Sequence, residues 1–252
     1  MMFLAYFIWW LLASIGLPLW IALLLVLLSS VALGLICERL FLRPLIGRSM
    51  LTTFMLCLFL GIFIKGAAIL SWGGFSRAMP HIFPSGYLII GNLSFSHTVL
   101  WGFIVAIALF LIFVFYFRYT RIGLGMRCVS EDHLISQSVG INVKRIFALS
   151  WVIGCIAAVI SGIVLASVLV LDPTMDEYAI IRALPVLLLG GLESIPGALV
   201  GGLLIGVAES LSATYIDPHV TAFRELLPFI LMVLIMMIRP QGLFGLKRIE
   251  RI

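Results

Sequence analysis

Charged residues are scarce in this chain of 252 amino acids, because only 11% of its residues are charged and 63% are hydrophobic. Soluble domains carry roughly 25% charged residues, so this composition excludes an ordinary water-soluble fold. Segments of about ten residues with alternating hydrophobicity, which a transmembrane β-barrel would need, are also missing. Apolar runs of about 20 residues recur instead, and this is the length at which an α-helix crosses a bilayer. The sequence therefore predicts an all-α fold, a polytopic transmembrane helical bundle.

Motifs of catalysis and cofactor binding are missing as well. The chain has no Walker A, GxSxG, HExxH or CxxC pattern, and the glycines of Gly123-Leu-Gly125 lack the strand and third glycine of a dinucleotide loop. The four cysteines show no disulfide or metal-ligand spacing, and the four histidines are far apart in the sequence. We therefore expect no enzyme activity, no metal and no cofactor, and any ATP hydrolysis must come from a separate polypeptide.

The basic residues, which give a net charge of +5, gather on three polar segments. This distribution follows the positive-inside rule and predicts that the three segments are cytoplasmic, the C-terminal one among them. It does not indicate nucleic-acid binding. The three segments carry Arg39, Arg43 and Arg48; Arg118, Arg121, Arg127, Lys144 and Arg145; and Arg239, Lys247, Arg248 and Arg251.

The segment 118–146 is the longest polar stretch between two apolar runs, and it has the signature of a short helix. Ser130 is expected to be the N-cap, with Glu131 and Asp132 in the first turn, where the helix dipole favours negative charge. Gly140 stands where a left-handed C-terminal cap would end the helix. The narrow apolar stripe consists of Leu134, Ile135 and Val139. Such a helix is either a plain connector or a docking element for a soluble partner.

The apolar segment 183–213 contains two interruptions, Gly190-Gly191 and Pro196-Gly197. Lys144 and Arg239 should both be cytoplasmic, so an even number of crossings must lie between them. We therefore predict that 183–213 is a broken, re-entrant hairpin that enters from outside, turns near Glu193 and returns outward. About six spans accompany it, at 3–15, 17–37, 51–70, 98–117, 147–170 and 222–238.

Two external segments complete the expected topology. Residues 71–96 form the longest external loop, in which 86–96 has the length and composition of a small β-hairpin. Residues 171–182 are polar and are expected to be external as well. The whole of 1–252 is then one transmembrane domain.

Three motifs resemble the permeases of branched-chain amino acid ABC importers, the LivH/LivM type. They are TRIGLGMRCVSED at 120–132 followed by GINV at 140–143, LGGLESIPGALVGG at 189–202, and IRPQGLFG at 238–245. The resemblance covers essentially the whole chain. Members of the family usually begin some 40 residues earlier, with a further span, so the chain is expected to lack that N-terminal part.

The resemblance implies a subunit of the bacterial inner (plasma) membrane that forms a translocation path. The expected partners are ABC ATP-binding subunits, a second permease subunit, a periplasmic or extracellular substrate-binding protein, and membrane lipid. The loop helix of the family docks on the ATP-binding subunit, and this assigns ATPase coupling to Arg127, Ser130, Glu131, Asp132 and Gly140. The candidates for the path and its gate are Gly190, Gly191, Glu193, Pro196, Gly197 and Glu209. Glu209 matches a glutamate usual in the family, whereas Glu193 departs from its pattern.

Three functions remain open at this point. The first is the importer permease, for branched-chain or other hydrophobic amino acids or for related small amides. The second is an ion-coupled secondary transporter, for which Glu193 and Glu209 would be the coupling carboxylates. The third is a truncated membrane subunit that transports nothing.

Overall fold

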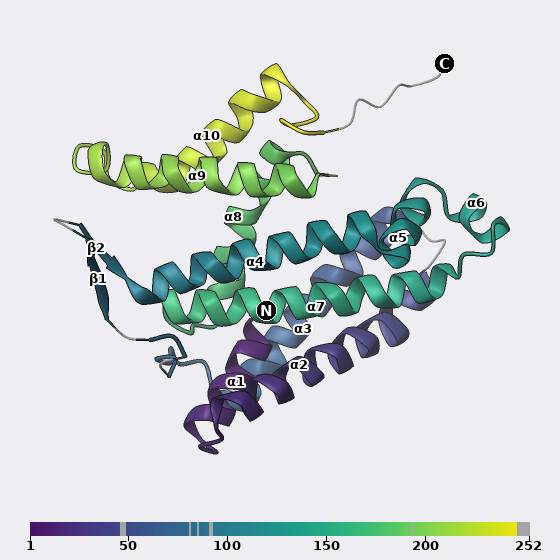
Figure 1. Ribbon diagram of the computed structural model, residues 1–252, viewed down its shortest axis with the longest axis horizontal. Coiled ribbons are helices and arrows are strands. Elements are labelled where there is room, and N and C mark those ends of the chain that lie inside the picture. The colour runs from purple at the N-terminus through teal and green to yellow at the C-terminus, as the bar shows by residue number, and fades with distance from the viewer. Residues whose placement is uncertain (46–48, 81, 85, 91–92, 193, 246–252) are drawn as a thin grey trace. The chain divides into compact units, whose positions relative to one another are not determined.

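A computed structural model describes residues 1–45, 49–80, 82–84, 86–90, 93–192 and 194–245. The chain divides into two compact units, Met1–Met175 and Asp176–Ile252, and each is described by itself. Nearly all of the regular structure is helical, and Figure 1 shows the elements with their labels.

Over the described residues, the first unit consists of seven α-helices, one π-helical turn, one 3-10 turn and one β-hairpin. Its elements are α1 (Met2–Ala13), α2 (Leu19–Ile36), a π-helical turn (Cys37–Leu42), a 3-10 turn (Arg43–Leu45), α3 (Met50–Trp72), β1 (Tyr87–Ile90), β2 (Leu93–Ser96), α4 (His97–Tyr119), α5 (Arg121–Glu131), α6 (His133–Ser138) and α7 (Val143–Val168). The short α1 is the most enclosed helix, with Met2, Tyr6 and Ile8 each at most 1% exposed. It packs on α2, α3 and α7, so the core of this unit surrounds its first helix.

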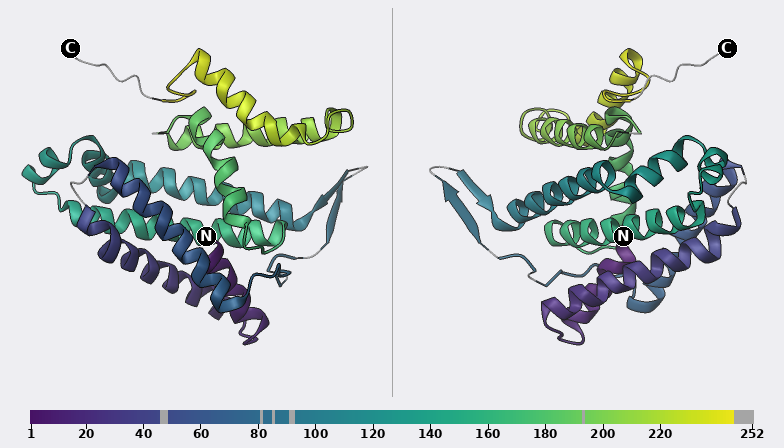
Figure 2. Two further views of the ribbon diagram at one scale, coloured as in Figure 1. Left: turned by 180° about the vertical axis from the view of Figure 1, so that it is seen from behind. Right: turned by 45° about the vertical axis from the view of Figure 1, so that its right-hand side comes forward.

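The predicted β-hairpin in 86–96 is confirmed. β1 and β2 pair antiparallel, with Tyr87 opposite Ser96 and Leu88 opposite Phe95. In Figures 1 and 2 the hairpin lies at one end of α4 and α7, and α6 lies at the opposite end. If the hairpin is outside the membrane, α6 is therefore on the inner side.

A backbone bridge closes the hairpin end of this unit. Arg77 and Leu171 exchange two backbone hydrogen bonds, of 2.8 and 3.1 Å. Beside them the Ser76 hydroxyl donates to Asp172 Oδ2 at 2.5 Å, and the Tyr6 hydroxyl donates to the Phe75 carbonyl at 3.1 Å. These bonds join the segment after α3 to the end of α7.

Hydrogen bonds from Ser76 and Thr174 hold the pKa of the Asp172 carboxyl below its ordinary value of 3.8. A depressed pKa stabilises the folded chain at pH values above 3.8, and this stabilisation is lost as the pH falls through the folded-state pKa. Thermal unfolding of the wild type and of Asp172→Asn should therefore differ at about pH 6, and the difference should shrink as the pH falls below 3.8. Ser76→Ala should remove most of the difference at about pH 6, and a gap that is equal at every pH would contradict this assignment.

The second unit consists of α8 (Met175–Gly190), α9 (Ile195–Tyr215) and α10 (Phe223–Ile238). The first residue of α8, Met175, is counted with the first unit. The second half of the polar segment 171–182 is helical, because α8 already includes Asp176 to Arg182. Asp176 and Glu177 occupy the first turn of α8, where the helix dipole stabilises carboxylates, so these polar residues begin a helix.

Within the described ranges, five helical stretches are long and apolar enough to cross a membrane. They are Leu19–Leu45, Leu51–Trp72, His97–Tyr119, Val143–Val168 and Ile195–Tyr215. The helices α1, α8 and α10 are shorter, at 12, 16 and 16 residues. The all-α polytopic bundle is confirmed, with differences in its spans. α1 and α10, at the predicted spans 3–15 and 222–238, are shorter than these five stretches, whereas the second arm of the predicted hairpin, α9, is long enough to be a full span.

Candidate functional site

The segment that joins α4 to α7 folds into two short helices. Thr120 accepts a hydrogen bond from the Gly123 backbone at 3.0 Å through its side chain and thereby caps the start of α5. Gly123, Gly125, Met126 and Val129 are buried, so α5 turns its small and apolar side toward the bundle. α5 contacts both α4 and α7, and this packing fixes the segment at the end of the two long helices.

The expected N-cap at Ser130 is wrong. Ser130 lies inside α5, where its hydroxyl donates to the Arg127 carbonyl at 2.8 Å, and Glu131 is the last residue of that helix. The cap of α6 is Asp132, whose Oδ1 accepts the Ile135 backbone N–H at 3.0 Å. Aspartate and serine cap helices about equally well. The run before Asp132 packs its buried residues against the bundle, and this packing keeps α5 helical up to Glu131.

Gly140 ends α6 as the sequence predicted. Its φ of +89° lies in the left-handed region, which a residue with a Cβ adopts only with strain. Two hydrogen bonds of 3.0 Å, from Gly140 N–H to the Gln137 carbonyl and from Ile141 N–H to the Ser136 carbonyl, form a Schellman cap. Asn142 then caps α7 by accepting the Arg145 N–H at 3.2 Å, so α6 connects to α7 through capped ends.

Arg127, Ser130, Glu131 and Asp132 are exposed, and they form a polar edge on α5 and its end. Next to them Ile135 of α6 and Val139, which directly follows α6, are 64% and 75% exposed. Two large apolar side chains on a polar, solvent-facing connection are unusual for a plain connector, and are typical of a helix that docks on another protein.

The second candidate site begins where the helix breaks. α8 ends at Gly190, and Gly191 has a φ of +100°. The Ser194 hydroxyl accepts the Gly197 N–H at 3.0 Å and starts α9, with Pro196 in its first turn. Proline suits that position because the first helical N–H groups have no intrahelical acceptor. Glu193 lies outside the described residues.

The two arms cross very closely at this break. A Cβ at Gly201 would lie 2.7 Å from the Val186 carbonyl oxygen, and a Cβ at Gly190 would meet the Gly197 carbonyl group. Backbone contacts of this kind require a glycine on at least one of the two helices, and they are the usual reason for small residues between membrane helices. Gly190, Gly191 and Gly197 are thus brought together as structural elements of one helix crossing.

The segment after α10 completes the break. Leu243 N–H donates to the Leu189 carbonyl at 2.9 Å, and Phe244 N–H donates to the Gly190 carbonyl at 3.1 Å. The last carbonyls of a helix have no partner within it, so these two bonds act as a cap supplied from a distant part of the chain. The motifs at 189–202 and 238–245, which are separate in sequence, therefore form one structural element.

Glu209 does not belong to this crossing. It lies on α9 and forms an ion pair with Arg182 of α8, at 2.9 Å between Arg182 Nη1 and Glu209 Oε2. The two side chains are 30% and 17% exposed. The Arg182 guanidinium also lies over the Tyr178 ring, 4.2 Å from its centroid. Among the described residues Glu209 Oε1 is buried and has no hydrogen-bond partner.

A cavity of about 170 Å³ opens beside this ion pair. Its lining consists of Tyr178, Ile181, Arg182, Glu209, Glu225, Pro228 and Phe229. The cavity therefore combines one cation, two carboxyl groups and an apolar wall, which suits a small ligand with charges of both signs. In the described part of the chain, no three histidine, cysteine, aspartate or glutamate side chains are grouped so that they could hold a metal ion.

The sequence analysis missed Arg182, Tyr178 and Glu225. Arg182 was predicted to end an external polar segment, although it stands between apolar residues, Ile180-Ile181 before it and Ala183-Leu184 after it. A charge in such surroundings requires a partner, and the carboxyl of Glu209 in the next apolar segment was the available signal.

Comparison with known proteins agrees with this architecture. The family model described as "branched-chain amino acid transport system / permease component" matches residues 1–236. The chain belongs to this family. The branched-chain permease protein LivH of Salmonella typhimurium is 31% identical over 228 residues, which cover 88% of this chain and 72% of that protein.

Two further proteins are similar to this member of the branched-chain permease family over most of its length. BraD, a high-affinity branched-chain amino acid permease protein of Pseudomonas aeruginosa, is 32% identical over 232 residues, covering 88% of this chain and 73% of that protein. A probable LivH of Methanocaldococcus jannaschii is 26% identical over 225 residues, covering 84% and 70%. No solved structure matches the chain. The resemblance seen in the three sequence motifs is confirmed: the chain is a multi-pass membrane permease component and not a member of an enzyme family.

Proposed function

We propose that the chain is the permease subunit of an ATP-driven importer for branched-chain amino acids, related hydrophobic amino acids or small amides. The observation that carries this proposal is the family match over residues 1–236, together with the exposed, capped α6 between two membrane helices. The chain would pair with a second permease subunit, with ABC ATP-binding subunits and with a substrate-binding protein outside the bacterial inner membrane.

The α5–α6 segment couples ATP hydrolysis to transport. Ile135 and Val139 would enter an apolar groove of the ATP-binding subunit, and Arg127, Ser130, Glu131 and Asp132 would surround them as a polar rim. The Asp132 cap and the Gly140 cap hold α6 in one conformation. A push on α6 is therefore passed through Asn142 to α7 and is not absorbed by the loop.

The topology that fits this function places the break of 191–194 toward the cytoplasm. The segment after Arg239 is hydrogen-bonded to the end of α8, and its basic residues favour the cytoplasmic side. α7, α8, α9 and α10 then cross outward, inward, outward and inward, which satisfies the even number of crossings and leaves the C-terminus cytoplasmic. Gly190, Gly191, Glu193, Pro196 and Gly197 form the inner gate in this arrangement.

The cavity beside Glu209 is the candidate place for substrate in this unit. The ammonium group of a zwitterionic amino acid would donate hydrogen bonds to Glu209 Oε1 and to the Glu225 carboxylate. Its carboxylate would accept hydrogen bonds from the Arg182 guanidinium. Ile181 and Phe229 would contact its apolar side chain. Alternating access would open this cavity to one side of the membrane at a time.

The importer proposal predicts the loss of partner binding when α6 is made polar. Full-length chain with Ile135→Asp and Val139→Asp, co-expressed with its partner subunits, should lose the ATP-binding subunit in a detergent pull-down, because two charged side chains would be buried in the interface. Uptake of labelled leucine should fall by more than about tenfold, which corresponds to about 1.4 kcal/mol of lost coupling.

Leu124→Asp is the matched control, since Leu124 is a 56% exposed apolar residue of the same segment but lies on α5. It should retain the ATP-binding subunit. Retention of that subunit by the Ile135/Val139 variant would count against the docking role of α6. Uptake that survives depletion of ATP and collapses with an ion gradient would overturn the importer in favour of a secondary transporter.

A further inference from the structure

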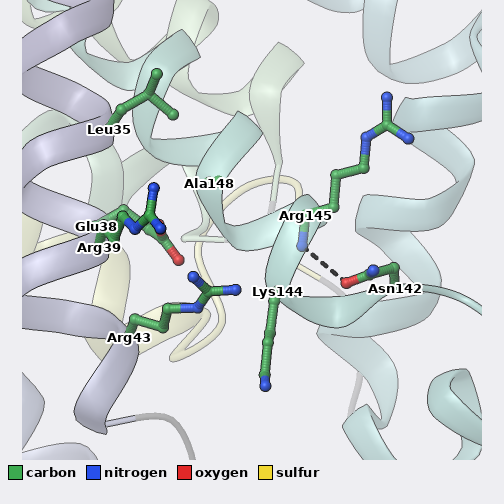
Figure 3. Close-up of a pocket in the computed structure, with 8 residues that line it drawn as sticks. All are labelled: Leu35, Glu38, Arg39, Arg43, Asn142, Lys144, Arg145 and Ala148. Atoms are coloured by element: carbon green, nitrogen blue, oxygen red, sulfur yellow. Dashed lines mark hydrogen bonds between the residues drawn. The ribbon is translucent and has the colours of Figure 1, made fainter.

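A second pocket, of about 280 Å³, lies in the first unit where the end of α2 meets the start of α7 (Figure 3). Its lining consists of Leu35, Glu38, Arg39, Arg43, Asn142, Lys144, Arg145 and Ala148. Four of these residues are cations, and they come from two elements that are about a hundred residues apart in the sequence. Figure 3 shows Arg39 and Arg43 extending from the α2 side toward the first turn of α7.

The geometry of the two helices creates this pocket. A Cβ at Gly34 would lie 3.1 Å from the Val152 Cα, so the backbones of α2 and α7 are in contact about one helical turn before Glu38. After that contact α2 continues into the π-helical turn Cys37–Leu42, and the pocket lies between this turn and the start of α7. Turns of this kind interrupt regular helices and are frequent at functional sites.

Glu38 stands at the base of the pocket in an unusual state. It is 4% exposed, and its Oε1 is buried with no hydrogen-bond partner among the described residues. A buried carboxyl oxygen without a donor is costly, and it indicates that a ligand supplies the donor. Figure 3 shows the carboxyl group on the same side as the Arg39 and Arg43 side chains.

The surroundings of the pocket are apolar on the side of α2. Leu28 and Leu35 of α2 are 59% and 45% exposed, and Leu40 in the π-helical turn is 64% exposed. The pocket also lies at the same end of α7 as α6, where the first-turn N–H groups and the helix dipole favour an anion. A ligand here would meet positive charge at its head and hydrocarbon beside it.

We propose that this pocket binds the head group of an anionic phospholipid that also carries a hydroxyl donor, of which phosphatidylglycerol is the simplest. Arg39 and Arg43 bind the phosphate, Lys144 and Arg145 add positive charge on the α7 side of the pocket, and a head-group hydroxyl donates to Glu38 Oε1. The acyl chains lie along the exposed leucines of α2. Basic pockets between helices at the inner side of a membrane are suited to such head groups, because each nearby cation adds about 1 kcal/mol of attraction.

A soluble anion fits less well, because it would contact only the basic residues and would use none of the apolar surface beside them. An acidic segment of a partner protein fits less well too, because the adjacent surface of α2 is hydrocarbon and not polar. The bound lipid would join α2 to the first turn of α7, the helix that follows α6, so the pocket links membrane composition to the coupling segment.

The test titrates purified full-length chain in detergent with phosphatidylglycerol and follows bound lipid by native mass spectrometry. Arg39→Gln with Arg43→Gln should bind phosphatidylglycerol on the order of thirtyfold more weakly, because two cations are removed. Arg118→Gln with Arg121→Gln removes the same charge from residues that do not line the pocket, and it should bind as the wild type does. Phosphatidylcholine should bind weakly to all three proteins.

Glu38→Gln keeps the shape of the side chain and tests the hydroxyl contact separately. Its preference for phosphatidylglycerol over phosphatidic acid, which lacks the hydroxyl donors, should fall by about threefold, the effect of half a kcal/mol or more from one hydrogen bond. An unchanged preference would overturn the contact with Glu38.

Three other results would overturn the lipid site. Equal weakening in the Arg118/Arg121 variant would show that charge alone, and not this pocket, attracts the lipid. Full competition by millimolar inorganic phosphate would assign the pocket to a free anion. Unchanged lipid binding in the Arg39/Arg43 variant, with loss of the ATP-binding subunit, would assign it to a partner protein. None of these outcomes depends on the substrate of the importer.

Discussion

Replacing Gly190 by alanine should destabilise the C-terminal unit by about 3 kcal/mol or more and abolish uptake. The new Cβ would meet the carbonyl group of Gly197, which is backbone and cannot rotate away as a side chain could. α8 and α9 would have to separate, and the caps that Leu243 and Phe244 provide to α8 would be lost with them. Thermal unfolding of the purified chain and uptake in membranes measure the two effects.

Gly206→Ala is the matched control for this change. Gly206 lies on the same helix as Gly197, but a Cβ there would meet nothing within 4 Å. Alanine is the better helix former by about 0.8–1.0 kcal/mol, so this variant should be as stable as the wild type or slightly more so. If Gly190→Ala and Gly206→Ala unfold at the same temperature, the close crossing of α8 and α9 is wrong.

The second large effect is expected from the ion pair between Arg182 and Glu209. Glu209→Leu should cost about 2 kcal/mol of stability, because it leaves the arginine without its partner in a largely apolar unit. This value is below the full cost of breaking a buried pair because Arg182 is 30% exposed. Uptake should fall by more than the stability loss explains, since Glu209 Oε1 would also receive the substrate ammonium.

Two further variants separate stability from transport. The exchange Arg182→Glu with Glu209→Arg should regain most of the stability, because the ion pair can form in reverse, yet uptake should remain lost. Arg224→Gln is the comparison from a more exposed pair, in which Arg224 is 52% exposed and lies 3.9 Å from Asp217, and it should change stability by less than about 1 kcal/mol. Recovery of uptake in the exchange variant would show that the pair has a structural role only.

The membrane spans could be predicted because the bilayer imposes length and polarity on each helix separately. A run such as 97–119 needs no knowledge of its neighbours to be recognised. The same holds for Gly140, where the local backbone conformation requires glycine. Local sequence determines these features, so local reasoning finds them.

The features that the sequence did not reveal depend on residues that meet from far apart. Ser130 had the pattern of a cap, but the packing of α5 on α4 and α7 extended that helix and moved the cap to Asp132. Arg182 had no partner in its own segment, and the structure places Glu209 of the next helix opposite it. The arginines at the end of α2 face the start of α7 only because Gly34 permits a close approach.

The bonds from Leu243 and Phe244 to the end of α8 also set an order of events during biosynthesis. α8 and α9 are made before residues 242–244, so the carbonyls of Leu189 and Gly190 begin without these protein donors. Such groups cost several kcal/mol in hydrocarbon, and the break must wait in contact with water until α10 has followed. The C-terminal unit therefore closes as a last step of assembly, and the segment after α10 is the part that the growing chain needs to complete the junction of α8 and α9.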